Sequence, residues 1–414
     1  MVKMMKTSAL IGLFALLAVP GQVLALEDVT LTNVKIAYGD TNTLLFPRIE
    51  VTATNLSRDE VAKLFSADTP KDVAASLLDK MEAARLYIPE GQMTESNGLL
   101  TLRAISAAKI NRGQFEKFDF AGLDGSFTPD KNGTYTVKVN ALSLDQGDVS
   151  GLFGALRTGQ IEDMTFRIGK MNWAGFDLTG PDDTISPTAP GGNLIKASLG
   201  SAMGETKFEG QIPISGSAEI KNLIVAMPPS SDQTQLLKLY GYDKLDLSFA
   251  TQFSFDPVKR SQKLDKLDIS MTDAGTLGLS GQFTNIDLEA LSKGDAAALM
   301  AMMDLEVSTF EMRFINAGLA EKGLAAYAAL QKKSAVAARQ ELSAMASGML
   351  PMLLGGNPAG RKLADAVAAF ISTPKSLVIN LKAKGKPLKV QDMAELTDPS
   401  SFFNRVDVEA QANR

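Results

Sequence analysis

The feature that most constrains the fold is an alternation of apolar and polar side chains over residues 245–256. Leu, Phe and one Thr occupy the odd-numbered positions, and mostly polar residues occupy the even ones. A period of two is typical of a β-strand with one buried and one solvated face, which antiparallel sheets permit. Similar segments follow at 266–271 and 277–283 after short turns. Residues 245–283 therefore predict a three-stranded antiparallel meander.

The N-terminal half carries the same pattern over 135–141, after a loop that ends in Asn132 and Gly133. Asn-Gly between alternating segments predicts a hairpin. Asp130 and Asn132 could instead be calcium ligands, but the loop lacks the further acidic positions and the closing Glu of an EF-hand. Further strands are predicted over 29–36, 49–53, 99–105, 164–168, 212–225, 305–314, 376–382 and 406–410.

Helices are predicted in two places. Thr69 as N-cap and Pro70 at the first helical position begin one, with an apolar stripe of Val73, Leu77, Met81 and Ala84. A larger helical block spans about 287–371, with helices over 296–303, 320–332, 334–354 and 358–371. The predicted fold class is α+β: mostly antiparallel β-sheet meanders with this C-terminal helical block packed on one sheet face.

Domain boundaries are predicted from a segment rich in Pro, Gly and short polar residues at 180–193. Such a segment, without apolar periodicity, is typical of a linker or a long surface loop. We therefore expect an N-terminal β-rich domain over 26–179 and a C-terminal domain over 194–414.

The N-terminus has the pattern of a secretory signal peptide. Lys3 and Lys6 precede an apolar segment at 9–19, and small residues at 23–25 predict cleavage after Ala25. The alternative is an uncleaved membrane anchor, since an uncharged segment at 7–26 is about long enough to span a bilayer. Pro20, Gly21 and Gln22 interrupt that segment. We expect a periplasmic protein without a transmembrane span after cleavage.

Composition excludes several classes of function. The chain contains neither Cys nor His, so catalytic triads built on His, and zinc, copper and haem sites that depend on Cys or His, are not expected. The formal charge is −5, and cleavage would remove two lysines and make it −7, which argues against nucleic-acid binding. We expect no enzyme activity, no cofactor and no metal. A carboxylate pair, a Ser/Lys dyad or an oxygen-ligated calcium site stays chemically open.

Two motif-like segments are better explained by structure. Ser106 and Lys109 have the Ser-x-x-Lys spacing, but they follow a predicted strand, whereas that chemistry needs a helix. The segment from Gly355 to Lys362 is similar to a phosphate-binding loop, but Arg361 stands where that motif requires Lys. A helix–helix turn explains the two glycines better.

Carboxylates that could form a hydrolase pair are Asp145, Asp148, Asp182 and Asp183, all of which we expect in loops, with no sign that any two converge. Trp173, the only tryptophan, is interpreted as a residue at the edge of the core rather than as a ligand clamp.

Methionines and leucines recur in the helical block, and methionine is common at adaptable apolar surfaces. They could form a helix layer over one sheet face or a groove for acyl chains. The candidate groove residues are Met300, Met303, Met345, Met349, Leu350 and Leu353.

A row of lysines follows in Lys382, Lys384, Lys386 and Lys389, the first three on one face of a strand or its extension. These lysines could protect a sheet edge from aggregation. They could instead bind anionic headgroups or an acidic partner.

The C-terminal half resembles a known family. The resemblance rests on Phe310–Phe314 at a strand end, on 316–319, on the helices from Arg339 to Leu354, and on the closing segment from Phe370 to Val378. It is similar to a family of uncharacterised exported proteins of Gram-negative, chiefly alphaproteobacterial, bacteria. The architecture also resembles, more remotely, the AsmA-like and tubular lipid-binding envelope proteins. The resemblance implies an envelope protein and no catalytic residues.

These observations favour a non-enzymatic periplasmic protein of the cell envelope that binds a lipid or other apolar ligand between sheet and helices. One alternative is a structural module that binds an envelope protein partner through a sheet face or edge. A carboxylate-based polysaccharide hydrolase is a third hypothesis, which needs two facing carboxylates.

Overall fold

The computed structural model of the chain describes residues 26–38, 42–95, 97–129, 133–158, 166–182, 184–189, 191–292, 296–394 and 399–413. The predicted signal peptide with its cleavage after Ala25 lies outside the described residues, as do Asp130, Asn132 and Asp183. Contacts divide the chain into two compact units, one of Met1–Thr206 with Met227–Ser230 and one of Lys207–Ala226 with Ser231–Arg414. The division thus falls after Thr206, and the segment 180–193 lies within the first unit.

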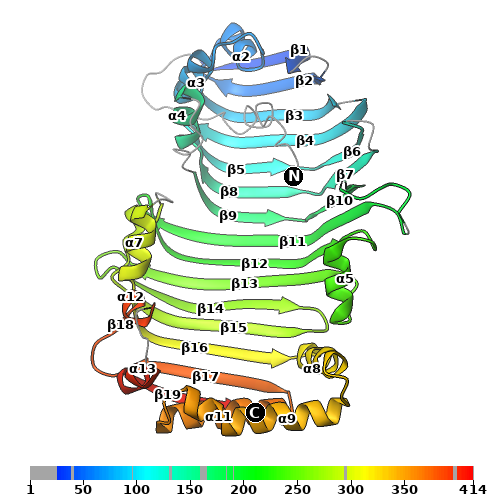
Figure 1. Cartoon of the computed structure of the whole chain (residues 1–414). Helices are drawn as coiled ribbons and strands as arrows, with labels where there is room; N and C mark the ends of the chain where they lie inside the picture. Colours follow the sequence, from blue (N-terminus) through cyan, green and yellow to red (C-terminus); the bar gives the residue numbers. More distant parts are fainter. Residues whose placement is uncertain are drawn as a thin grey trace. The chain divides into compact units, whose positions relative to one another are not determined.

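The described residues of the first unit form an antiparallel sheet with three short helices (Figure 1). Its strands are β1 (Glu27–Tyr38), β2 (Asn42–Thr54), β3 (Glu82–Glu95), β4 (Gly98–Asn111), β5 (Gln114–Phe120), β6 (Leu123–Phe127), β7 (Tyr135–Val139), β8 (Leu142–Asp148), β9 (Arg167–Trp173), β10 (Phe176–Pro181) and most of β11 (Leu194–Glu209). Its helices are α2 (Arg58–Leu64), α3 (Lys71–Lys80) and α4 (Gly151–Thr158). The predicted hairpin is confirmed. Strands β6 and β7 pair antiparallel, from Leu123 opposite Val139 to Phe127 opposite Tyr135.

The second unit is a meander that ends in helices. Its strands are β12 (Ile212–Ala226), β13 (Leu245–Asp256), β14 (Ser261–Met271), β15 (Gly275–Thr284), β16 (Glu306–Asn316), β17 (Ser376–Ala383), β18 (Leu388–Lys389) and β19 (Val406–Ala412). Its helices are α5 (Asp232–Leu239), α6 (Leu288–Ser292), α7 (Ala296–Asp304), α8 (Leu319–Leu330), α9 (Ala335–Gly348), α10 (Leu350–Leu353), α11 (Pro358–Ser372), α12 (Val390–Ala394) and α13 (Pro399–Arg405). Strands β13, β14 and β15 pair in sequence order, which confirms the predicted meander and the α+β class.

The first unit has a well-filled core. Phe46, Ile49 and Ile105 on the strands are at most 1% exposed, and they belong to the same cluster as Leu78 of α3 and Phe153 of α4. Burial of large apolar side chains is the main favourable contribution to folding. This unit therefore has the interior that a stable sheet with one covered face requires.

Strands of the first unit break along one line across the sheet. Two-residue gaps separate β5 from β6, β7 from β8, and β9 from β10, and the residues across the gaps still pair in register. Gly175 in the last gap has φ 89°, and a Cβ there would lie 1.8 Å from the carbonyl oxygen of Leu199. Only glycine fits such a position. Trp173 and Phe176 flank this gap and stack, with ring centroids 5.5 Å apart.

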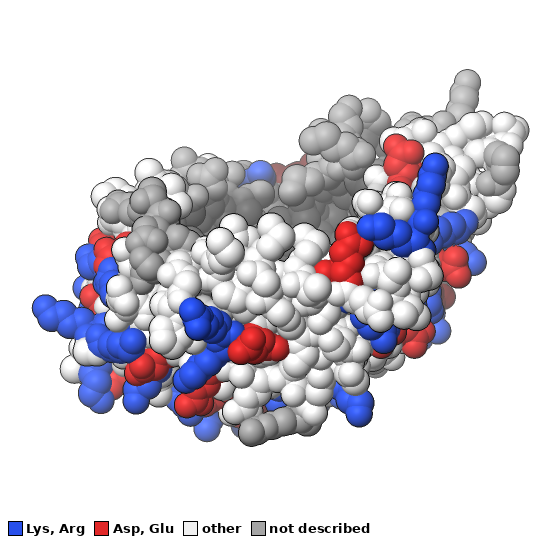
Figure 2. Space-filling view, turned by 60° about the horizontal axis from the view of Figure 1, so that its bottom comes forward, with Lys and Arg blue, Asp and Glu red and all other residues white. Residues whose placement is uncertain are grey.

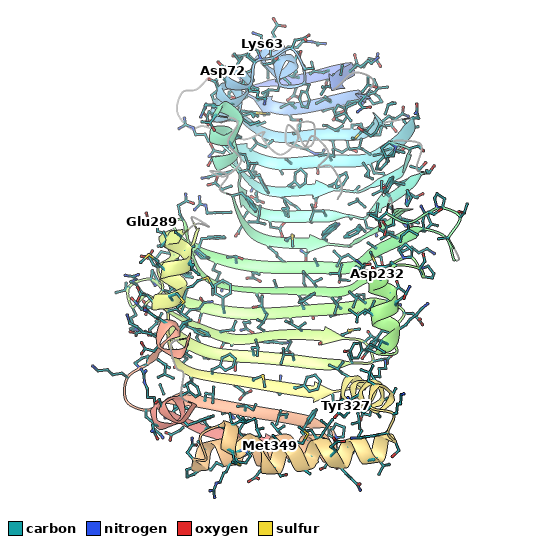
Figure 3. All side chains as sticks on the ribbon, viewed as in Figure 1. Lys63, Asp72, Asp232, Glu289, Tyr327 and Met349 are labelled. Carbon is teal, nitrogen blue, oxygen red and sulfur yellow. The ribbon has the colours of Figure 1, made fainter. Side chains whose placement is uncertain are left out.

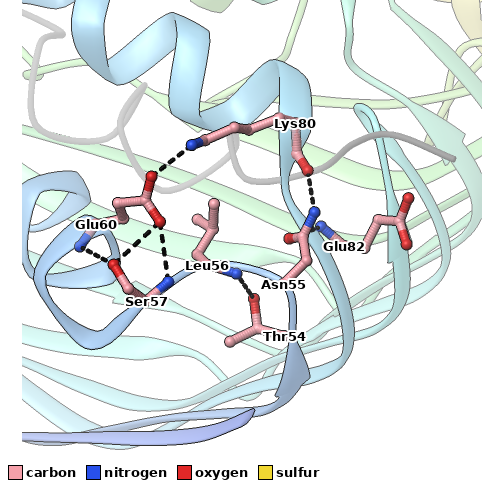
Figure 4. Close-up of polar contacts among 7 residues, drawn as sticks. All are labelled: Thr54, Asn55, Leu56, Ser57, Glu60, Lys80 and Glu82. Carbon is pink, nitrogen blue, oxygen red and sulfur yellow. Dashed lines mark hydrogen bonds and ion pairs between the residues drawn. The ribbon is translucent and has the colours of Figure 1, made fainter. Parts of the chain in front are cut away.

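Helix α2 begins with a capping box at the end of β2 (Figure 4). The Ser57 Oγ accepts from the backbone N–H of Glu60, and the Glu60 carboxylate accepts from the backbone N–H of Ser57. Lys80, the last residue of α3, forms an ion pair with Glu60. Asn55 then joins the end of α3 to the start of β3, because its amide donates to the Lys80 carbonyl and accepts from the Glu82 N–H. Helices α2 and α3 are thereby held at one end of the strands.

The predicted helix over residues 69–84 is wrong at both ends. Pro70 occupies the N-cap position without a side-chain hydrogen bond, and α3 ends at Lys80. Met81 is fully buried at the turn into β3, which contains Ala84. Apolar residues are buried on both sides of this boundary, Leu78 in α3 and Ala83 in β3. The apolar pattern therefore could not show where the helix ends and the strand begins. The strand predicted from 164 begins at Arg167, and 164 lies outside the described residues.

The C-terminal helices contact the last strands of the second unit. Helix α11 contacts β17, β19 and α9, and α9 and α11 lie side by side next to β19 (Figure 1). Asn357 caps α11, since its Oδ1 accepts from the Gly360 N–H at 2.7 Å. Gly355 and Gly356 before it have φ of 79° and 67°. The predicted helix–helix turn between Gly355 and Lys362 is thus confirmed.

Candidate functional site

One face of the sheet in the second unit is apolar across six strands. Strand pairing brings side chains of the same face into rows that cross the strands, and three neighbouring rows are apolar. We call this surface the apolar sheet face; its rows are Ile220, Phe249, Ile269, Leu277, Phe314 and Leu377; Leu267, Leu279, Met312 and Ile379; and Phe253, Leu264, Phe310 and Leu381. Strands β12 and β14 each contain one extra residue, and the resulting register shifts keep these apolar residues on one face.

Helices of the second unit do not cover most of the apolar sheet face. Phe249, Leu279 and Met312 are only half-buried. The buried clusters of this unit, within the described part of the chain, are small and centre on Val406 of β19 and Leu324 of α8. Among the described residues of this unit, the closest helix–strand packing is on β17, β18 and β19. Strands β12 to β15 therefore present an apolar surface that the described helices leave open.

The opposite face of the same strands is polar and internally compensated. Asp268 on β14 lies 3.3 Å from the Lys266 Nζ and 3.8 Å from an Arg313 guanidinium nitrogen. Ser270 and Thr276 share a hydrogen bond of 2.9 Å. This face resembles ordinary solvated sheet surface, so the two faces differ in what they can bind.

A small apolar pocket lies at one end of the apolar sheet face. Its volume is about 310 Å³. Phe283, Phe310 and Leu381 from the sheet line it, together with Leu388 of β18 and Phe402 of α13. Ser308 is the one polar residue among its lining residues. A pocket of this composition suits a hydrocarbon group rather than a charged one.

The predicted lysines lie near this pocket. Lys384 and Lys386 belong to the loop that joins Ala383 to Leu388, which we call the lysine loop. Ala383 and Leu388, at the two ends of this loop, both line the pocket. The Lys384 Nζ lies 3.6 Å from Asp407, and Lys386 is exposed. Lys382 lies on β17.

The interpretation of these lysines as protection of a sheet edge is wrong for Lys382. Strand β17 pairs with β16 on one side and β19 on the other, so it is not an edge. Lys389, at the end of the row, forms an ion pair with Asp304 at 2.9 Å.

A larger cavity of about 940 Å³ in the same unit is lined by charged and polar residues together with apolar ones such as Leu264, Phe310 and Leu381. Lys382 and Lys384 line it with Lys263 and Lys362, and the acidic Asp265, Glu311, Asp407 and Glu409 line it too. Lys263 pairs with Asp265 and Lys384 with Asp407. Because its charges are balanced, this cavity has less chemical selectivity than the smaller apolar pocket.

The predicted methionines and leucines lie elsewhere. Met300 on α7 and Met345, Met349 and Leu353 on α9 and α10 are 45–69% exposed, while Met303 and Leu350 are half-buried. Figure 3 shows Met349 on the helical layer next to β19. The structure therefore does not bring these six residues together with the lysines around the apolar pocket. Sequence reasoning missed the sheet residues as a site, although their alternation was the signal that could have identified them.

In the first unit, Trp173 lines a separate cavity of about 520 Å³ on strands β4, β5, β8, β9 and β11. Its Nε1 is buried and has no hydrogen-bond partner among the described residues. Its half-buried ring stacks on Phe176. The ring therefore has both an aromatic neighbour in the fold and a side that faces the cavity.

Of the carboxylates singled out in the sequence, Asp145, Asp148 and Asp182 lie within the described residues, and no contact between any two of them is seen there. Asp145 and Asp148 lie in β8 rather than in loops, while Asp182 is in a loop. Asp148 binds Arg167 and accepts hydrogen bonds from the N–H and Oγ of Ser150. Burial alone would raise the pKa of Asp148, but these hydrogen bonds and the Arg167 charge outweigh it and lower that pKa. A carboxylate with a lowered pKa is a poor general acid at neutral pH.

The described ranges of the chain hold neither a metal-binding cluster nor a membrane-spanning helix. No group of three or more acidic side chains in these ranges could hold a metal ion. The helices found in them are all too short or too polar to cross a bilayer.

Comparison with known proteins gives a match over the C-terminal region. A family model described as "Uncharacterized protein" matches residues 268–413, which include β15 to β19 and helices α6 to α13. No curated protein matches the chain. The C-terminal region is therefore similar to a recognised protein family, over about the part that carries the apolar pocket and the lysine loop.

Proposed function

We propose that this protein is a non-enzymatic, exported protein of the cell envelope that binds the acyl chain of a lipid along the apolar sheet face. The observation that carries the proposal is the contrast between the two units. The first packs its large apolar side chains into one extensive buried cluster, whereas the buried clusters of the second are small and the side chains of its three apolar rows are only partly buried. Leaving so much contiguous apolar surface in water is unfavourable, and it is typical of a binding surface.

The dimensions of the apolar sheet face suit a hydrocarbon chain. Six strands with a spacing of about 4.8 Å make its longest row about 24 Å long. One leaflet of a bilayer has a hydrocarbon depth of about 15 Å, half of the usual core thickness. A lipid chain laid across the strands thus fits within the row, and the apolar pocket can take its end or a branch.

The lysine loop supports the same proposal for the polar end of the lipid. Lys384 follows Ala383, a lining residue of the apolar pocket, and Lys386 comes two residues later. An ammonium group near the mouth of an apolar site attracts an anionic headgroup. We therefore infer a ligand with one hydrocarbon part and one anionic part.

The cellular location is part of the proposal. It is supported by the signal-peptide pattern before Ala25 and by the resemblance to exported, chiefly alphaproteobacterial, proteins and to AsmA-like envelope proteins. N-terminal sequencing of the protein isolated from its host tests it. A first residue of Leu26 in a periplasmic fraction is the expected result, and an intact N-terminus in the membrane fraction would support the anchor instead.

Lipid binding is tested with protein purified from its host. Native mass spectrometry should show co-purifying lipid, and delipidated protein should bind the fluorescent fatty acid cis-parinaric acid. The double variant Leu279→Gln, Ile379→Gln places two amides in the middle row and should weaken binding at least about ten-fold, because burying unpaired amides is costly. The control Ser280→Gln, Asn380→Gln changes the next residues on the same strands, which face the other side, and should leave affinity unchanged.

Three outcomes would contradict the proposal. Protein without co-purifying lipid that also fails to bind the probe leaves the face without a lipid ligand. Loss of binding in the control rather than in the test variant would move the site to the larger cavity, which Ser280 and Asn380 line. Self-association of ligand-free protein, abolished by Leu279→Gln, would favour the alternative of a protein-interaction module.

A further inference from the structure

A second apolar surface of the same unit lies on its helices and has an exposed stripe. Met345, Met349, Met352 and Leu353, which we call the methionine patch, are 45%, 54%, 78% and 66% exposed. Their spacing of i, i+4, i+7 and i+8 places them on one helical face. The joint between α9 and α10 keeps this face continuous, since the Met349 N–H donates to the Met345 carbonyl and the Leu353 N–H donates to the Met349 carbonyl.

The exposure of the methionine patch is not a result of loose packing. Ala338 and Ala346 on the inward face of α9 are buried, and Leu342 packs against α8. The Ser343 Oγ lies within hydrogen-bond distance of two groups on α11, the Ala368 carbonyl at 3.3 Å and the Ser372 Oγ at 2.9 Å. These contacts hold α9 against α11. Helix α9 is therefore held with Ala338 and Ala346 inward and Met345 toward solvent.

The segment that carries the methionine patch has a net charge opposite to that of the whole protein. Residues 331–375 contain six basic and two acidic residues, a net charge of +4 in a chain of net charge −5. One of the two acidic residues, Glu341, is already paired with Lys333 at 2.6 Å. The segment therefore has an excess of positive charge that the rest of the chain lacks.

Two of these basic residues lie at the start of α11, which contacts α10. Gly360 lies so close to Leu354 that a Cβ at Gly360 would be 2.8 Å from the Leu354 Cβ. The next two residues of α11, Arg361 and Lys362, are both exposed. Figure 2, which brings the lower side of Figure 1 forward, shows a wide uncharged area with both basic and acidic residues at its borders.

We propose that the methionine patch and the surrounding basic residues bind the surface of an anionic membrane. An exposed apolar helical stripe with a basic border is the pattern of a helix that lies in the headgroup region, where apolar side chains enter the hydrocarbon and Lys and Arg contact anionic lipids. Unbranched methionine side chains adapt to a fluid surface. This surface is separate from the apolar sheet face, and its role does not depend on lipid binding there.

Vesicle co-sedimentation of the full chain tests the proposal. We expect the wild type to bind phosphatidylcholine vesicles that contain phosphatidylglycerol, to bind pure phosphatidylcholine weakly, and to lose affinity as salt increases. The variant Met345→Ser, Met349→Ser, Met352→Ser should reduce binding to the anionic vesicles at least about ten-fold, since each side chain would lose its insertion into hydrocarbon. A matched control is Leu299→Ser, Met300→Ser, Met302→Ser on α7, which removes an equally exposed apolar set and should bind like the wild type.

The charge component has its own pair of variants. Arg361→Gln, Lys362→Gln should weaken binding to anionic vesicles about ten-fold, because each basic residue near an anionic surface contributes attraction. Arg58→Gln, Lys71→Gln makes the same change in net charge in the first unit and should have little effect. Leu279→Gln, Ile379→Gln should keep vesicle binding even where it abolishes binding of the fatty-acid probe, so the two proposals fail separately.

Three results would overturn membrane docking. The first is equal binding to neutral and anionic vesicles, and the second is unchanged binding in both the methionine and the arginine–lysine variants. The third is an absence of vesicle binding together with a dimer in sedimentation velocity that the methionine variant dissociates, which would assign the patch to contact between copies of the chain. Circular dichroism of each variant checks that α9 stays folded.

Discussion

Phe314 on β16 and Phe370 on α11 meet edge to face, with ring centroids 5.8 Å apart and planes inclined by 75°. Phe314 belongs to the apolar sheet face, so this contact is where the last long helix meets that face. Next to it, Asn413 after β19 donates to the Ala369 carbonyl at 2.9 Å. These two contacts attach the end of α11 to β16 and to the residue that follows β19. Among the described residues, the apolar rows on β12 to β15 have no comparable aromatic contact with a helix.

Replacing Phe370 should therefore loosen α11 without disturbing the first unit. Phe370→Ala is expected to lower the free energy of unfolding of the second unit by about 2 kcal/mol, because a half-buried ring loses part of the usual burial energy and one aromatic pair. Phe370→Leu, which keeps most of the apolar volume, should cost less than half of that. Urea unfolding followed by circular dichroism measures both, and equal values for the two variants would contradict the role of the ring contact.

The open apolar sheet face predicts unusual tolerance of polar substitution. Leu279→Asn in ligand-free protein should cost about 1 kcal/mol, because its side chain keeps part of its contact with water. Ile105→Asn in the first unit, at a position that is 1% exposed, should cost more than about 3 kcal/mol, because it buries an unpaired amide and removes a packed side chain. Similar losses at both positions would mean that the face is covered, and the comparison uses urea unfolding of the two variants.

The break between β9 and β10 depends on glycine. Gly175→Ala should destabilise the first unit by more than about 2 kcal/mol, since residues other than glycine rarely adopt this backbone conformation and the new Cβ would meet the Leu199 carbonyl. A Cβ added at Gly154 in α4 would have no neighbouring atom within 4 Å, so Gly154→Ala should be neutral or stabilise by up to about 1 kcal/mol. Thermal unfolding of the pair tests this, and a harmless Gly175→Ala would show that the break needs no glycine.

Local pattern predicted much of the second unit. The alternation at 245–256 matches β13 residue for residue, and the helices predicted from Ala/Leu periodicity correspond to α7, α8, α9 and α11. The reason is that both periods there are long and uninterrupted, with turn residues between them. In the first unit, the strands interrupted at Gly122 and Gly175 were largely missed, because a break every few residues shortens each alternating segment below what a pattern can identify.

The candidate site was predicted less well, for a physical reason. Alternation shows that Leu279 and Met312 share a face, but it does not show whether anything covers that face. Coverage depends on where α9 and α11 dock, and the methionines of the helical block are as apolar in sequence as the residues of the sheet. Only the contacts of α11 with β17 and β19 show that the helices lie at the end of the sheet and leave the middle rows open.

Lys386 tests the polar end of the proposed ligand. Lys386→Gln should weaken binding of an anionic fatty-acid probe about five-fold, as expected when one basic residue near an anionic group is removed, and leave binding of its neutral methyl ester unchanged. Lys238→Gln on α5, in the same unit and away from the pocket residues, is the control for net charge. An equal loss for acid and ester would show that Lys386 acts on the fold rather than on the headgroup, and fluorescence titration distinguishes the two.

The Asp148–Arg167 pair predicts how the first unit responds to acid. Hydrogen bonds from Ser150 and the Arg167 charge lower the pKa of Asp148 in the folded protein, against the opposing effect of burial. A group with a lowered folded-state pKa stabilises the fold above its unfolded pKa, which is about 3.9 for Asp. That stabilisation is lost as the pH falls below about 4 and the carboxylate is protonated. Asp148→Asn should therefore cost about 2 kcal/mol at pH 7, the value of a hydrogen bond to a charged group, and clearly less at pH 3.

The control for this pH dependence is Asp119→Asn on the neighbouring strand β5. Asp119 forms an exposed ion pair with Lys117 at 3.2 Å, and such pairs contribute less than about 1 kcal/mol. Urea unfolding of wild type and both variants at pH 7, 5 and 3 gives the difference in free energy at each pH. The expected result is a difference for Asp148→Asn that is constant from pH 7 to 5 and shrinks at pH 3, while Asp119→Asn stays close to the wild type throughout. A difference for Asp148→Asn that is the same at pH 3 as at pH 7 would show that the side chain acts through packing alone, and that its charge contributes nothing to holding β8 against β9.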